Sequence, residues 1–246
     1  VVKFQTRTNK DLLSKEEYSK PHPIPENSYG STYGEHREKL EFTIDQHKIL
    51  KKECEKLNVI YSTSVWDLNA AKEICKINPA LIKVPSATNT DKHLMEFLLK
   101  NYKGEIHISL GMTKRDEEKK IFNMVLKHSR GKDTIFYHCI SGYPVETEHL
   151  YLNEILKLKE KYEGKLKGIG FSGHHKGIAP DIAALSMGAC FFERHFTLDR
   201  TWKGTDQEAS CEQNGFRKLS RDLRLVSRSL KVKPSEILDI ENEQRS

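Results

Sequence analysis

The sequence lacks several signatures that would each indicate a function class directly. It contains no GxGxxG or GxxxxGK[ST] phosphate loop, which disfavours dinucleotide-binding and P-loop architectures. It contains no CxxC spacing, and its five cysteines are odd in number and mostly lie inside apolar runs, which is typical of core side chains in a reducing compartment. No stretch resembles a signal peptide or reaches membrane length, so we expect a cytoplasmic protein without a membrane partner.

The charge of the chain is modest and carries no concentrated basic region. Lysine and arginine number 41 against 35 acidic residues, and the resulting net charge of +6 is spread over 246 residues. A nucleic-acid-binding protein more often shows a basic stripe with interleaved aromatic residues. We therefore expect no nucleic-acid partner, and the length fits a single α/β barrel domain.

Short apolar runs alternate with longer segments of helical spacing along the whole chain. Because this alternation is typical of parallel sheets, and because the runs lack a period of two, we expect a sheet covered on both faces. A barrel or a doubly wound sheet would fit. The predicted strands are 1–4, 59–61, 81–84, 106–110, 134–138, 166–171 and 190–192, and the predicted helices are 45–57, 68–76, 91–101, 116–128, 149–162, 179–187 and 215–230, with Thr113 and Asp116 as a capping box before the fourth helix.

The ends of the predicted strands favour the barrel. Nearly every run is followed by polar residues able to do chemistry, and in a (β/α)8 barrel all such ends meet at one mouth. Since seven strands are recognisable, we expect a TIM barrel whose first strand and helix lie outside this sequence. The barrel would occupy residues 1–230 and a charged linker or tail residues 231–246, while the proline-rich segment 20–33 would form an extended loop over the mouth.

Two histidines and a carboxylate follow neighbouring predicted strands near the end of the chain. His174 lies in the run from Gly168 to Gly177, and Glu193 and His195 follow the next apolar run. Side chains that converge from adjacent strand ends form a candidate metal or acid/base site, although a single histidine there is more often structural. Lys3 and Lys83 are costly to bury without an anion, which favours anion binding. His138 could equally be a satisfied core residue or line the site.

In this order the strand ends resemble the sialic acid synthase family, the N-acetylneuraminate synthases and their phosphate-using relatives. The resemblance covers almost the whole chain, and each block alone is weak. The blocks are Lys3-Phe-Gln5, Thr32-Tyr-Gly-Glu-His36, Lys83-Val-Pro-Ser86, Ser109-Leu-Gly-Met112, His138-Cys-Ile-Ser-Gly-Tyr-Pro144, Gly170-Phe-Ser-Gly-His174 and Glu193-Arg-His-Phe-Thr197 through Lys203-Gly-Thr-Asp206.

The resemblance implies a transferase that condenses phosphoenolpyruvate with N-acetylmannosamine or its 6-phosphate, giving a nine-carbon 2-keto sugar acid and phosphate. It implies a divalent metal, Mn or Mg, on His174 and His195, with Glu193 and both histidines as catalytic residues. It also implies substrate contacts. Those for phosphoenolpyruvate are Lys3, Thr63, Lys83, Ser86, Ser109, Ser141 and Tyr143, and those for the sugar are Gln5, Tyr143 and Asp206.

The resemblance does not decide which sugar is the acceptor, and it also implies an oligomeric state. Gly173, where many bacterial members have aspartate, brings the chain closer to animal-type enzymes that accept the phosphorylated sugar. The alternatives are a legionaminic-, pseudaminic- or spore-coat-type synthase and, from another class, a non-catalytic sugar-binding barrel. Most members carry a C-terminal antifreeze-like lid that reaches the partner subunit, which implies a homodimer.

Overall fold

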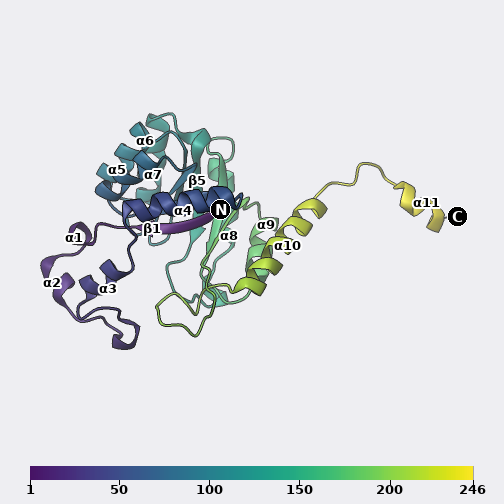
Figure 1. Ribbon diagram of the computed structural model, residues 1–246. Coiled ribbons are helices and arrows are strands. Elements are labelled where there is room, and N and C mark those ends of the chain that lie inside the picture. Colours follow the sequence, from purple (N-terminus) through teal and green to yellow (C-terminus); the bar gives the residue numbers. More distant parts are fainter. Residues whose placement is uncertain (246) are drawn as a thin grey trace.

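Seven parallel strands form one curled sheet in the computed structural model of the protein, which describes residues 1–245 (Figure 1). The strands pair in sequence order from β1 to β7. Within the described chain β7 and β1 do not pair with each other, so a closed eight-stranded barrel is not confirmed and the sheet has two edges. The strands are β1 (Val2–Thr6), β2 (Tyr61–Val65), β3 (Leu81–Val84), β4 (Glu105–Ser109), β5 (Thr134–Cys139), β6 (Gly168–Gly173) and β7 (Phe191–Arg194).

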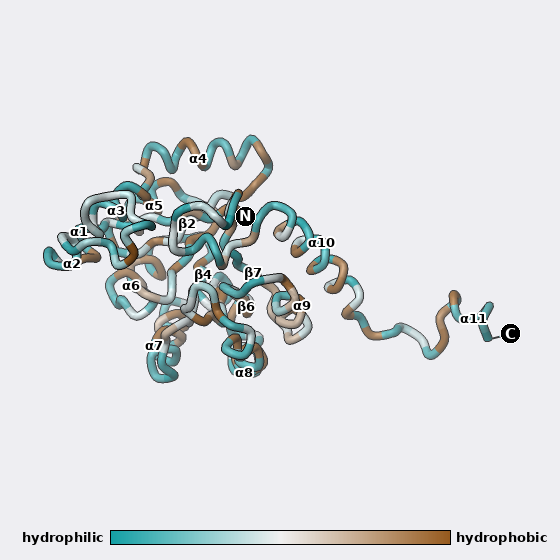
Figure 2. The backbone as a smooth tube through the Cα atoms, turned by 90° about the horizontal axis from the view of Figure 1, so that it is seen from below, coloured by the Kyte–Doolittle hydropathy of each residue, from teal (hydrophilic) through white to brown (hydrophobic). Residues whose placement is uncertain are grey.

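All seven predicted helices are present and lie on the outer side of the sheet (Figures 1 and 2). Side-chain caps explain several starting points: Thr43, Asp67 and Asp91 each accept a backbone N–H of the first turn. These helices are α4 (Ile44–Lys56), α5 (Leu68–Ile77), α6 (Lys92–Asn101), α7 (Arg115–Lys127), α8 (Asn153–Tyr162), α9 (Ala179–Ser186) and α10 (Gln213–Ser229).

The strand between α4 and α5 begins where the predicted one ends. The prediction of 59–61 stopped at the first hydroxyl side chains, but β2 runs Tyr61–Val65 and all five of its residues are buried. Ser62 and Ser64 pair in register with Lys3 and Gln5 on β1. The polar side chains therefore belong to the inner face of the sheet, and successive strand residues alternate between this face and the helices.

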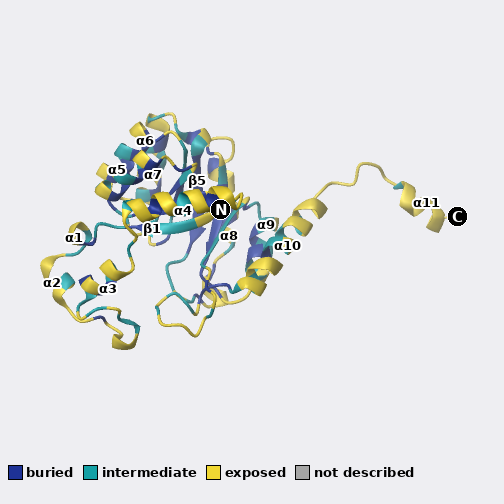
Figure 3. Cartoon of the chain, in the orientation of Figure 1, coloured by how far each residue is buried: buried dark blue, intermediate teal, exposed yellow. Residues whose placement is uncertain are grey.

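The apolar core lies between the outer face of the sheet and the helices, where Figure 3 colours buried residues dark blue. Ile82, Ile106 and Ile108 of the strands and Leu94 and Leu98 of α6 are each fully buried. Burying such a side chain contributes roughly 1.5–3 kcal/mol. The helical layer is thus the main source of cohesion, and the inner face is left available for polar residues.

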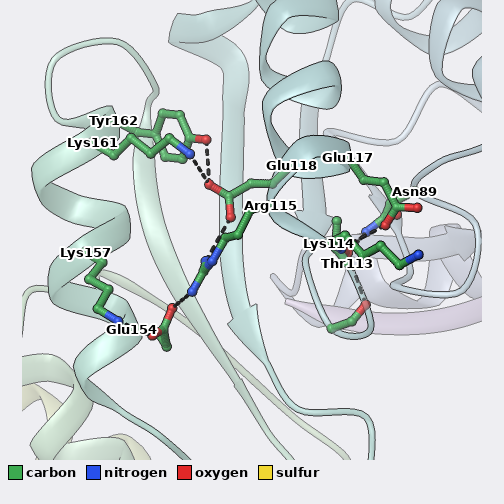
Figure 4. Close-up of polar contacts among 11 residues, drawn as sticks. Asn89, Thr113, Lys114, Arg115, Glu117, Glu118, Glu154, Lys157, Lys161 and Tyr162 are labelled. Atoms are coloured by element: carbon green, nitrogen blue, oxygen red, sulfur yellow. Dashed lines mark hydrogen bonds and ion pairs between the residues drawn. The ribbon is translucent and has the colours of Figure 1, made fainter.

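Two polar arrangements fix α7, and one of them corrects the predicted cap (Figure 4). Thr113 does not cap the helix, because its hydroxyl accepts a hydrogen bond from Asn89 and donates to the carbonyl of Gly111. The backbone N–H of Lys114 instead donates to Glu117 at 2.8 Å. On the other side of α7 the buried carboxylate of Glu118 accepts hydrogen bonds from side chains that include those of α8: Arg115, Lys161 and Tyr162.

The remaining segments are short helices and loops. The predicted loop 20–33 is preceded by α1 (Asn9–Leu12) and α2 (Lys15–Ser19), contains a 3-10 turn (Pro25–Asn27) and leads into α3 (Tyr33–Lys39), none of which was predicted. The segment after α10 runs away from the body and ends in α11 (Asp239–Arg245), which buries no residue (Figure 1). No helix in residues 1–245 is both long and apolar enough to cross a membrane.

Candidate functional site

A cavity of about 360 Å³ opens on the inner side of the sheet, and nearly all of the predicted site residues line it. They come from β1, β3, β4 and β7 and from the segments that follow β3, β5, β6 and β7. The structure brings together Lys3, Gln5, Lys83, Ser86, Ser109, Ser141, Tyr143, His174, Glu193, His195 and Asp206.

Two lysines share one carboxylate in this cavity. The Lys83 ammonium donates a hydrogen bond to Glu193 Oε2 at 2.7 Å, and Lys3 Nζ lies 3.7 Å from Glu193 Oε1. Lys3 also donates to the Ser64 hydroxyl at 3.0 Å, and the Ser172 hydroxyl donates to Glu193 at 3.2 Å. Two cations against one anion leave an excess positive charge, which is suited to a negatively charged ligand.

The protonation of this cluster follows from burial and from its neighbours. Burial alone would raise the pKa of Glu193, but Coulombic attraction by Lys3 and Lys83 and the hydrogen bond from Lys83 outweigh it and hold that pKa far below its usual range. Burial lowers the pKa of Lys3, and the attraction of Glu193 opposes this. Glu193 is therefore a carboxylate at neutral pH.

The imidazole of His174 has its ring tautomer set by the backbone. Its Nδ1 lies 2.9 Å from the carbonyl oxygen of Ile140, and since a carbonyl only accepts, Nδ1 carries the proton. Burial lowers the pKa of His174 to about 4, so the ring is neutral at pH 7. Its Nε2 lone pair is then free for a ligand, and the ring contacts Tyr143 with 4.2 Å between centroids.

His195 is oriented by a carboxylate instead. Its Nδ1 lies 3.3 Å from Asp206 Oδ2, and its ring centroid lies 5.1 Å from that of His174. Burial would raise the pKa of Asp206, but the hydrogen bond and attraction of His195 bring it below the ordinary value. Both rings thus have Nδ1 held by an oxygen, the arrangement by which proteins orient histidines that use Nε2 as a metal ligand.

The donor set fits part of a metal site. No group of three or more histidine, cysteine, aspartate or glutamate side chains with metal-binding geometry occurs among residues 1–245. Two imidazoles whose Nδ1 atoms are held by oxygens present their Nε2 atoms, which suit a divalent transition metal such as Mn²⁺. The remaining coordination positions would have to come from substrate or water, which leaves such a metal open to a reacting molecule.

A loop contact holds the segment that carries Asp206. The Tyr29 hydroxyl donates to the carbonyl of Lys203 at 2.9 Å, and the N–H of Gly204 donates to Asn27 at 3.2 Å. The Lys203 ammonium also lies 4.8 Å from the centre of the Tyr29 ring. The segment 20–33 therefore reaches the loop after β7, which agrees with its predicted position over the mouth.

Gly111 allows two of the predicted serines to approach each other. A Cβ at this position would lie 2.5 Å from the Ser141 hydroxyl and 2.7 Å from that of Ser86, closer than real side chains come. Asn89 fixes the same corner, since its amide donates to the carbonyl of Ser109 at 2.7 Å. The serine hydroxyls therefore converge because a glycine leaves room between them.

Two of the sequence-derived candidates lie elsewhere. Thr63 does not line the cavity, because it pairs with Phe4 on the outer face of the sheet and its hydroxyl bonds to that of Thr6 at 2.8 Å. Ser64 lines the cavity in its place. His138 also faces outward, with its Nε2 on the carbonyl of Leu150 at 2.8 Å, which identifies it as the satisfied core residue of the two alternatives.

The sequence reasoning missed four residues at one end of the cavity: Arg7, Tyr33, Arg37 and Trp66. A signal for the first was available, because Arg7 continues the alternation of Lys3 and Gln5 on the same side of β1. Nothing in the sequence pattern places the other three at the mouth.

A second buried charged group lies behind the cavity without lining it. Arg194 donates to Asp181 Oδ2 at 2.6 Å and to the carbonyl of His175, and His175 Nε2 lies 3.1 Å from the same carboxylate oxygen. This group joins β7 to α9 and to the segment after His174. Three of its atoms, His175 Nδ1, Asp181 Oδ1 and Arg194 Nε, are buried without a partner in the described chain.

The NeuB family model matches residues 1–234 of this chain. N-acetylneuraminate-9-phosphate synthase of Homo sapiens is 32% identical over 240 residues, which are 98% of this chain and 65% of that protein. N,N'-diacetyllegionaminic acid synthase of Campylobacter jejuni is 26% identical over 93% of this chain and 68% of its own length. The N-acetylneuraminic acid synthetase of Leptospira borgpetersenii has a similar fold, with a TM-score of 0.83, 24% identity and coverage of 99% of this chain and 79% of the other.

Proposed function

This chain belongs to the NeuB family, and on that premise we propose that it is a synthase that condenses phosphoenolpyruvate with an N-acetylated amino sugar. The chain spans 65% of the length of its human relative, whose name describes formation of a 9-phosphorylated sialic acid. The observation that carries the proposal is the excess positive charge of Lys3 and Lys83 over Glu193 beside two oriented histidines in one cavity.

Lys3 and Lys83 would bind the phosphate of phosphoenolpyruvate, with the hydroxyls of Ser86, Ser109 and Ser141 as further donors. Lysine suits this role because it is a compact charge with three donors. When phosphate takes the lysines, Glu193 loses part of the attraction that depresses its pKa. The carboxylate then becomes a better base, able to accept a proton from the water that adds at C2 while phosphate leaves with C–O cleavage.

In the same proposal C3 of phosphoenolpyruvate attacks the aldehyde carbon of the open-chain sugar. The aldehyde oxygen takes the electron pair of the broken C=O π bond and a proton to become a hydroxyl, and C2 is left electron-poor for the water that adds there. Gln5, Tyr143 and Asp206 would bind the hydroxyls and the acetamido group of that sugar. Burial raises the pKa of Tyr143 well above its usual value, so its phenol remains a hydrogen-bond donor at neutral pH.

His174 and His195 would hold a divalent ion, Mn²⁺ or Mg²⁺, through their Nε2 atoms. Such an ion, when bound, polarises an aldehyde oxygen. The chain's own contribution is to orient both rings through their Nδ1 atoms, which are held by the Ile140 carbonyl and by Asp206.

The proposal extends to the surroundings of the site. In the described part of the chain β1 and β7 each have an unpaired edge, and an eighth strand between them would complete a (β/α)8 barrel. A homodimer and a cytoplasmic location belong to the same proposal.

A second candidate keeps the phosphoenolpyruvate half and changes the sugar. The similarity to a diacetyllegionaminic acid synthase supports a 2,4-diacetamido hexose as the acceptor. Both candidates share the lysine cluster, so the acceptor sugar alone distinguishes them.

The test is phosphate release from phosphoenolpyruvate by the protein. It is offered N-acetylmannosamine, its 6-phosphate or a 2,4-diacetamido hexose, with Mn²⁺ and again after chelation. We expect metal-dependent release with one sugar. Absence of release with every sugar, from folded and metal-loaded protein, would contradict the proposal and favour a non-catalytic sugar-binding barrel.

A further inference from the structure

Two arginines occupy the end of the cavity that the proposed reaction leaves unused. Arg7 and Arg37 both line it, and their guanidinium carbons lie 5.3 and 5.8 Å from the centre of the Trp66 ring. The indole N–H of Trp66 donates to Gln5 at 2.9 Å. The arginines are therefore connected through one rigid side chain to a residue expected to bind the sugar.

The charges of the two arginines are not both neutralised. Arg7 is paired with Glu41, which accepts from its backbone N–H at 3.0 Å and from Nε at 2.5 Å. Among the described residues Arg37 donates hydrogen bonds only to neutral acceptors, Asn9 at 3.0 Å and the Tyr33 hydroxyl at 3.4 Å. This end of the cavity therefore carries one positive charge without a carboxylate to balance it.

One nitrogen of Arg37 has nothing to bind. Its Nη2 is buried and has no hydrogen-bond partner in the described residues. A buried donor without an acceptor destabilises a fold, and a donor on a charged group does so more strongly. Since the planar guanidinium matches the oxygens of a phosphate, an incoming phosphate ester would supply the missing acceptor.

The position of the two arginines relative to the lysines suits a long substrate. Lys3, Gln5 and Arg7 alternate along the same strand direction, so Lys3 and Arg7 are separated by about 13 Å of extended chain. Two phosphates bound at these ends would leave the Gln5 region between them for the carbon skeleton of a sugar.

We propose that Arg37, supported by Arg7 and Trp66, binds a phosphate ester carried by the acceptor sugar, so that the acceptor is an anionic hexosamine phosphate. This inference rests on the proposed function and deepens it, because it decides between a phosphorylated and a neutral acceptor.

The experiment compares kcat/KM for N-acetylmannosamine 6-phosphate with kcat/KM for N-acetylmannosamine in the wild-type protein and in Arg37→Met. We expect the wild type to prefer the phosphorylated sugar and Arg37→Met to lower that preference by roughly 10- to 100-fold, the range for a hydrogen bond to a charged group. Arg37→Lys, which keeps the charge but not the planar fork, should lose less. The KM for phosphoenolpyruvate should stay the same.

Arg221→Met is the matched control, because Arg221 is exposed on α10 and paired with Asp222. It should keep the wild-type preference. Thermal unfolding of each variant reports whether the fold is retained. A wild type that prefers the neutral sugar would overturn the inference, as would equal losses with both sugars in folded Arg37→Met or a higher KM for phosphoenolpyruvate in that variant.

A separate binding measurement distinguishes this inference from the proposed reaction. If the wild type releases no phosphate from phosphoenolpyruvate, the proposed reaction fails, and calorimetric titration with N-acetylmannosamine 6-phosphate then decides about the subsite. Binding that Arg37→Met abolishes would sustain the phosphate subsite. A wild type that does not bind the sugar phosphate would overturn it.

Discussion

Two buried charged groups lie close together in this protein and differ in their charge balance. Near the mouth, Lys3 and Lys83 face the single carboxylate of Glu193, and all three line the cavity. Behind it, Arg194 faces the single carboxylate of Asp181, with His175 on the same oxygen, and none of the three lines the cavity. The first group has one more lysine than carboxylates and is accessible to a ligand, whereas the second connects β7 to α9. Excess charge with access indicates binding, and matched charge without access indicates structure.

The largest expected effect comes from removing the cation of the group behind the cavity, which consists of Arg194, Asp181 and His175. Arg194→Met would leave the Asp181 carboxylate buried with only His175 beside it. We expect the free energy of unfolding to fall by about 3–5 kcal/mol, the usual consequence of leaving one buried charge uncompensated. Denaturant titration followed by circular dichroism measures this. The double variant Arg194→Met with Asp181→Asn should recover part of the loss, and a single variant as stable as the wild type would contradict the structural role.

The matching change in the group at the mouth, which consists of Lys3, Lys83 and Glu193 and is called the mouth group below, should affect activity more than stability. Lys83→Met removes one of the two cations that would stabilise the departing phosphate, while Lys3 remains to compensate Glu193. We expect kcat to fall roughly 10²- to 10³-fold, as when one preorganised electrostatic donor is removed. The unfolding free energy should fall less than in Arg194→Met. The reverse order of the two effects would undo the distinction between the groups.

His107, which lies next to the mouth group, should make the stability of the protein depend on pH. It lies beneath the mouth group, since Lys83 sits over the Tyr137 ring and the Tyr137 hydroxyl bonds to His107 Nδ1 at 2.7 Å. Burial lowers the pKa of His107 to about 4, although Glu105 opposes the shift. Because the folded pKa is below the unfolded value, the unfolded chain takes up the proton first as pH falls from about 6.5 to 4, and stability decreases over that window by up to about 3 kcal/mol.

His107→Gln should remove this contribution. Denaturant titrations at pH 7 and at pH 4.5 would then show a smaller acid-induced loss of stability in the variant than in the wild type. An unchanged loss would mean that His107 takes up its proton with the same pKa in the folded and unfolded states.

The smallest expected effect concerns the carboxylate that orients His195. Asp206→Asn keeps an acceptor for His195 Nδ1 but removes the charge, so we expect a loss in activity or metal affinity of about 10-fold, the lower end for residues that orient a metal ligand. Asp199→Asn is a suitable control, because Asp199 lies in the same loop and accepts hydrogen bonds from Thr201 instead. Equal effects of the two changes would assign the loss to the loop.

The sequence predicted the order of the seven strands and their helices because apolar periodicity is a local property that tertiary packing reinforced. It misplaced β2 and Thr63 because Ser62 and Ser64 are polar yet buried, and hydroxyl side chains inside a sheet look like the end of a strand. The strand ends also predicted which residues gather at the mouth, since parallel strands deliver their C-terminal ends to one side.

Other features could not be predicted because they depend on contacts between distant segments. Arg37 reaches the cavity from α3, and only the positions of its neighbours reveal that none of the described residues is an anionic partner for it. The Arg194–Asp181 pair likewise joins residues whose roles the sequence pattern does not distinguish from those of Glu193. Whether a charged side chain is balanced depends on residues that are distant in the sequence and close only in the folded protein.

The most direct test of the account is calorimetric titration of phosphoenolpyruvate into the wild-type protein, Lys83→Met and Arg194→Met, at a temperature where all three are folded. The account predicts one site in the wild type, at least roughly tenfold weaker binding in Lys83→Met, and nearly wild-type binding in Arg194→Met. Binding by Lys83→Met as tight as that of the wild type would contradict the claim that the uncompensated charge at the mouth is the anion site.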